Sequence, residues 1–213
     1  TFTEGVGSSG TPSNGFQILK DNEVTLKNGT LNVAEESKNE FYILVQNYAD
    51  LTVTDMVLDG TNLDKWSTTD GDSYVLSNNS GTVNITGNTT IIANDDGDKA
   101  FAFDVCKYQN YDAPVVNVNT TGKISGKIEV SAEIATNLNI SGGTFNGEIL
   151  SSISEGFITG GTFGSDPSAY VAKGFTATEK DGVWTVATAA AKIGDNYYAT
   201  LADAFNAAGC EIG

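Results

Sequence analysis

The chain has 213 residues, and 27 acidic residues against 11 basic ones give it a formal net charge of −16. Every basic residue is a lysine and there is no histidine. The chain therefore lacks histidine, which is the usual proton shuttle at neutral pH and the commonest nitrogen ligand for metals. It also lacks the arginine guanidinium group, which binds anions through bidentate hydrogen bonds. Nucleic acids and anionic membrane surfaces repel such an acidic protein, so we expect neither as a partner.

The composition is that of a folded protein made of short strands and turns. Hydrophobic residues make up 39% of the chain and charged residues 18%, and there are 24 glycines but only 3 prolines. No apolar run is long enough to cross a membrane, so no membrane insertion is expected. The sequence begins at Thr1 and shows no signal peptide. We therefore expect a part of a longer polypeptide.

A repeated segment organises the chain after a flexible N-terminal segment, which we place at residues 1–14. Within residues 15–164, six stretches align with one another: 24–31, 51–58, 83–91, 116–124, 138–145 and 156–163. Most stretches begin with alternating apolar and polar residues, which is typical of a half-buried strand. The aligned inward residues are Val24/Leu26, Leu51/Val53, Val83/Ile85, Val116/Val118, Leu138/Ile140 and Ile158.

A second apolar position follows each bend in the repeat. It is occupied by Leu31, Leu58, Ile91, Ile124, Phe145 and Phe163. Strand, bend and strand with aligned apolar residues predict coils that stack into a common core. The expected fold is therefore all-β: a right-handed parallel β-helix of about six coils with a small C-terminal β/α extension. Residues 33–50, 59–82 and 92–114 are expected to be projecting loops, and a β-sandwich is the alternative fold.

Residues 165–213 have a different pattern and are expected to form a C-terminal cap of short helix, strand and helix. Asp166 and Pro167 predict the start of a short helix that ends before Gly174. A strand is expected over 182–186. Thr200 and Asp203 resemble a capping box, which predicts a helix over 201–208 leading into a further module.

The C-terminal third resembles a known kind of protein. Ile140-Ser-Gly-Gly-Thr-Phe145, Ile158-Thr-Gly-Gly-Thr-Phe163 and Ile193-Gly-Asp-Asn-Tyr-Tyr-Ala-Thr-Leu-Ala-Asp-Ala204 carry the resemblance. They are similar to repeat modules of large secreted surface proteins from gut anaerobic bacteria, which belong to the pectate-lyase-like right-handed β-helices. The resemblance is specific over residues 138–208 and only architectural over residues 15–130. It implies an extracellular or cell-surface module.

The function predicted on these grounds is non-catalytic binding of glycans, or adhesion. Sugar rings pack on aromatic planes while amides and carboxylates bind their hydroxyls. The candidate ligand-binding residues are Trp66, Tyr74, Tyr108, Tyr111, Asn84, Asn117 and Asn139. For each of them, local packing or solvation of an outer sheet face is the plainer interpretation.

Two other functions stay open. A purely structural spacer or fibre rod needs only stacked repeats and an acidic exterior. A polysaccharide lyase or hydrolase is less favoured, because the lyase mechanism of the resembling superfamily commonly uses an arginine base, and the chain has none. We therefore expect no enzymatic activity.

Metal binding and the cysteines are separate questions. Asp95, Asp96 and Asp98 offer the oxygen atoms that Ca²⁺ prefers, so a structural calcium site is a candidate there and no other cofactor is expected. Cys106 and Cys210 lack metal-site spacing. Two unpaired thiols are favoured over a bridge between them.

Overall fold

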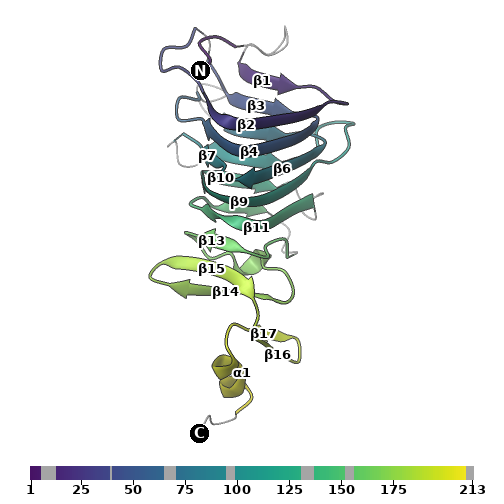
Figure 1. Ribbon diagram of the computed structural model, residues 1–213, viewed down its shortest axis with the longest axis vertical. Coiled ribbons are helices and arrows are strands. Elements are labelled where there is room, and N and C mark those ends of the chain that lie inside the picture. Colours follow the sequence, from purple (N-terminus) through teal and green to yellow (C-terminus); the bar gives the residue numbers. More distant parts are fainter. Residues whose placement is uncertain are drawn as a thin grey trace.

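The computed structural model describes residues 1–5, 13–38, 40–64, 71–94, 99–130, 137–151 and 156–209. Over these residues the chain is mostly β-structure, with a single α-helix at the far end of the stack from β1 (Figure 1). The predicted all-β character is confirmed.

A six-stranded sheet forms one wall of the molecule. All its strand pairs are parallel. In spatial order it contains β1 (Asn14–Ile18), β3 (Ile43–Asn47), β5 (Ser73–Asn78), β8 (Ala100–Val105), β10 (Lys127–Val130) and β12 (Ile149–Ser151).

A nine-stranded sheet forms the other wall. Its parallel part contains β2 (Glu23–Asn32), β4 (Asp50–Asp59), β6 (Thr82–Gly87), β7 (Thr90–Ile92), β9 (Val115–Ser125), β11 (Leu138–Phe145) and β13 (Gly161–Phe163). β15 (Val183–Thr188) then pairs antiparallel with β13, and β14 (Phe175–Lys180) pairs antiparallel with β15. As far as β6 the chain alternates strictly between the two walls. Each strand therefore pairs with the strand that forms when the chain next returns to the same wall.

The prediction of a single right-handed β-helix of about six coils is wrong. The strands form a six-stranded parallel sheet, a nine-stranded mixed sheet and a separate two-stranded sheet of β16 (Ala191–Ile193) and β17 (Asn196–Tyr198). The repeat specifies which strands lie side by side, but it does not specify the number of sheets or where pairing becomes antiparallel. That change occurs at a tight turn, where Asp181 and Gly182 both have positive φ.

The aligned positions of the repeat do predict the register of the nine-stranded sheet. Leu51 pairs with Val24 and Val83, and Val116 pairs with Val83 and Leu138. The second apolar position is also in register: the pairs are Leu31–Leu58, Leu58–Ile91, Ile91–Ile124, Ile124–Phe145 and Phe145–Phe163. The Phe145 and Phe163 rings stack with their centroids 4.9 Å apart.

The six-stranded sheet supplies the facing half of the core. Val45, Leu76, Phe103, Ile128 and Ile149 are paired in sequence across its strands, and all five are buried. Both sheets contribute to a single hydrophobic cluster. The stretches expected as projecting loops therefore contain β3, β5 and β8, and the expectation of loops there is wrong.

Some C-terminal elements lie where the local signals predict them, whereas the strands β14, β16 and β17 were not predicted. Ser168–Tyr170 form a 3₁₀ turn, and Gly174 has a φ of +93°. α1 (Leu201–Ala207) begins after Thr200, whose hydroxyl accepts a hydrogen bond from the Asp203 backbone N–H at 3.1 Å. Within the described residues, no helix combines the length and the apolar character that crossing a bilayer requires.

Candidate functional site: a groove at the sheet corner

A groove of about 580 Å³ lies where the chain passes from the six-stranded sheet to the nine-stranded sheet. Four connections build it: those that follow β1, β3, β5 and β8. Because the strands are parallel, all four connections emerge at the same edge of the sheet. The groove is therefore a direct product of the strand order.

Buried amide and backbone groups fix the shape of the groove walls. The Asn47 side chain is fully buried; it accepts a hydrogen bond from the Ala49 N–H at 3.1 Å and donates to the carbonyls of Ala49 and Ser80. One connection is thus tied to the next. Gly81 has a φ of +79°, and a Cβ there would lie 2.1 Å from the Ala49 carbonyl oxygen, so no other residue fits without strain.

Three tyrosines form an aromatic cluster on one side of the groove. Tyr48 lines the groove, and its ring centroid lies 5.9 Å from that of Tyr108 and 4.9 Å from that of Tyr111. Tyr48 is buried, whereas Tyr108 is 41% exposed. Burial is the main cause that raises the pKa of Tyr48 to about 12, and the charges of Tyr108, Tyr111 and Asp104 add to it. Tyr48 is therefore an uncharged aromatic side chain of the groove lining at neutral pH.

Charged side chains line the rest of the groove. Asp21, Glu23, Asp50 and Asp112 contribute carboxylates, and Lys20 contributes an ammonium group. The Thr82 backbone N–H donates to the Asp50 carboxylate at 2.7 Å. These groups can bind hydroxyls and amines through hydrogen bonds.

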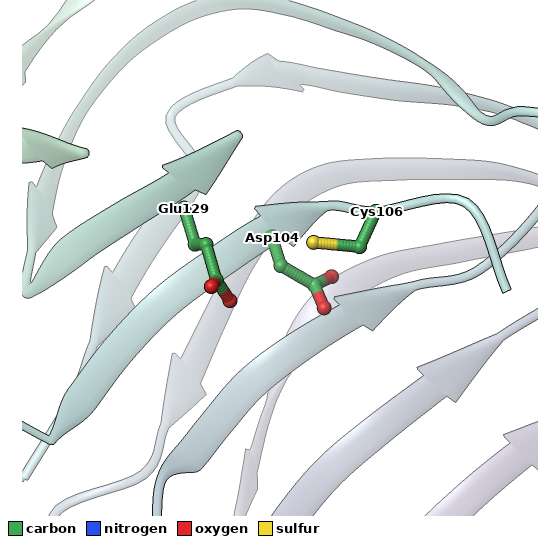
Figure 2. A group of neighbouring side chains, drawn as sticks. All are labelled: Asp104, Cys106 and Glu129. Atoms are coloured by element: carbon green, nitrogen blue, oxygen red, sulfur yellow. The ribbon is translucent and has the colours of Figure 1, made fainter. Parts of the chain in front are cut away.

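A second cluster lies on the outer face of the six-stranded sheet. Asp104 on β8 is the register partner of Glu129 on β10, and Cys106 follows β8. Figure 2 shows the two carboxylates and the thiol gathered around a common space, and one ligand atom of each lies within 4.8 Å of the others. The Asp104 carboxylate also contributes to the raised pKa of Tyr48.

The Asp104 carboxyl group is held in an unusual environment. It is only 5% exposed, and it accepts hydrogen bonds from the Ser77 hydroxyl at 3.3 Å and from the Asn78 backbone N–H. Burial and the nearby Glu129 carboxylate together raise the pKa of Asp104 to about 8, although the two hydrogen bonds act in the opposite direction. At neutral pH this side chain is mostly protonated.

Such a set of two carboxylates and a thiol has the donor chemistry of a site for Zn²⁺ or a similar ion. A sugar in the groove cannot contact the Asp104 carboxyl group, because that group is almost entirely covered.

The structure separates the predicted binding residues. Tyr108 and Tyr111 lie next to each other, and both contact Tyr48, which lines the groove. Tyr74 lies on β5 instead of a loop; its ring stacks on Phe101 and its hydroxyl donates to Glu129 at 2.8 Å. Trp66 and the calcium candidates Asp95, Asp96 and Asp98 lie outside the described residues, as does Cys210.

The predicted asparagine stripe forms on the nine-stranded sheet, away from the groove. Asn117 donates to Asn84 and Asn139 donates to Asn117, each at 3.0 Å. These amides hydrogen-bond one another along the stack, which indicates a structural role.

Sequence reasoning missed Tyr48 and Asp104. An acid within the apolar stretch Ala100–Val105 is a signal that could have identified Asp104, because a buried carboxyl group is costly unless it has partners. Comparisons with known proteins add no relative: no family model, no curated protein and no solved structure matches the chain.

Proposed function

We propose that this chain is a non-catalytic surface module that binds glycans in the corner groove. The observation that carries the proposal is the groove itself, which combines a fixed backbone, a lining tyrosine that packs against two others, and four carboxylates. The C–H face of a sugar ring packs on an aromatic plane, while carboxylates and backbone groups orient its hydroxyls.

An extracellular or cell-surface location forms part of the proposal. It is supported by the resemblance of residues 138–208 to modules of secreted surface proteins, and by the predominance of acidic residues that keeps such a surface soluble. In this interpretation the stacked sheets act as a stiff support that holds the four connections in place.

A glycan array with the purified chain, run with calcium and with EDTA, tests the proposal. Ligands that bind are then titrated against Tyr108→Ala and Tyr111→Ala. We expect each variant to lose about two- to ten-fold in affinity, since stacking of one ring on an aromatic side chain is worth about 0.5–1.5 kcal/mol. Tyr197→Ala, in the separate two-stranded sheet, is the matched control.

Each outcome has a definite meaning. Binding that weakens in both groove variants, but not in the control, supports the proposal. A blank array with calcium and with EDTA refutes it and leaves a structural spacer as the remaining function. Equal loss in all three variants would place the binding surface elsewhere.

A further inference from the structure

The groove carries a strong local imbalance of charge. Among the described residues that line it, Asp21, Glu23, Asp50 and Asp112 oppose a single ammonium, that of Lys20. The Lys20 ammonium lies 3.9 Å from the Asp112 carboxylate, and these side chains are 48% and 92% exposed. So loose and solvated a pair neutralises little of the charge.

This imbalance acts on whatever occupies the groove. Charges in water interact over roughly 8 Å at physiological ionic strength. A ligand inside a groove of about 580 Å³ lies within that range of several carboxylates at once. Uronate, sialate or sulfate groups would therefore be repelled, and protonated amines would be attracted.

The tyrosine cluster favours the same kind of ligand. The face of an aromatic ring attracts an ammonium group that lies within about 6 Å of its centroid. Tyr48 lines the groove, and the exposed Tyr108 packs against Tyr48. Aromatic faces and carboxylates together form the usual surroundings of a bound organic cation.

We infer that the groove selects glycans that carry protonated amino groups, such as β-linked glucosamine chains, over neutral and anionic glycans. The inference rests on the proposed glycan binding and specifies its ligand class. Sugar hydroxyls and ring faces would supply the common part of the affinity, and the ammonium groups would supply the discrimination.

The test uses three oligosaccharides of equal length: a glucosamine oligomer, its fully N-acetylated counterpart and an oligogalacturonate. Each is titrated calorimetrically in a mildly acidic buffer, in which sugar amines are protonated and ordinary carboxyl groups are ionised. We expect the glucosamine oligomer to bind several-fold more tightly than the N-acetylated one, and the galacturonate not to bind. Added salt should weaken only the glucosamine complex.

Charge-neutral variants locate the effect. Asp21→Asn and Asp112→Asn should each lower the affinity for the glucosamine oligomer about three-fold more than they lower the affinity for the N-acetylated oligomer, which is the usual range for an exposed charge pair. Asn suits the positive φ of residue 21. Asp195→Asn, at the exposed turn between β16 and β17, is the matched control.

The outcomes separate this inference from the proposed function. Equal binding of the glucosamine and N-acetylated oligomers, or binding of the galacturonate, overturns the selectivity while glycan binding stands. A glucosamine preference that Asp195→Asn reduces as much as the groove variants do also overturns it, because general protein charge would then be the cause. No binding of any of the three overturns the selectivity, and the glycan array then decides separately whether glycan binding stands.

Discussion

Replacing Asp104 by Asn should make the protein more stable at alkaline pH. The carboxyl group has a pKa of about 8 in the folded protein against an ordinary value of 3.8. Between these two values the folded state holds a proton that the unfolded state has released. The stabilising contribution of the protonated form is therefore complete below about pH 4 and is lost as the pH rises through about 8.

The magnitude follows from the same two values. Each pH unit within that window lowers the free energy of unfolding by about 1.4 kcal/mol. From pH 5 to pH 8 the parent protein should thus lose about 4 kcal/mol relative to an Asn variant, which has no titrating group at this position. The variant keeps an oxygen that can accept from the Asn78 N–H.

Urea denaturation followed by circular dichroism, at a series of pH values and with EDTA present, measures this difference. The control is Asp195→Asn, whose pH profile should run parallel to that of the parent. If Asp104→Asn also runs parallel to the parent between pH 5 and pH 8, Asp104 is ionised in the folded protein and the reasoning is refuted. A parent that gains stability over this window relative to the variant would contradict the sign.

Three further changes test other parts of the structure. Glu129→Gln should lower the pKa of Asp104 in the folded protein, because it removes a like charge; the same denaturation series measures this change. Phe103→Ala should cost about 3–5 kcal/mol of unfolding free energy, since the ring is fully buried between neighbouring strands. Gly81→Ala should cost at least ~2 kcal/mol through contact with a carbonyl oxygen, whereas Gly174→Ala, also at positive φ but in open space, should cost less. Equal urea midpoints for the two glycine variants would contradict the role of close contact.

The repeat made the register of the nine-stranded sheet predictable from the sequence. Alternation such as Leu51-Thr52-Val53 marks a strand with one buried face, and a shift of one residue would expose that face. β5 and β8 were not predictable in this way. Their stretches, Ser73–Asn78 and Ala100–Val105, are short runs buried on both faces, so they show little alternation and match no common template.

The groove was only partly predictable for a related reason. Tyr108 and Tyr111 could be chosen because they are aromatic residues in a polar stretch. Their partner Tyr48 lies on a different connection, and only the stacking of the strands brings the three rings together. Long-range proximity of this kind depends on the strand order, which no local pattern in a single sequence encodes.

The four connections around the groove have a consequence for how such a protein can diversify. Each connection is anchored at both ends by strands whose ladders are fixed independently of it. Residues that do not hold one connection to the next can therefore change in number or type while the core, and tying residues such as Asn47 and Gly81, stay as they are. Recognition would vary in a combinatorial manner, one connection at a time, much as antibody loops vary on a constant framework.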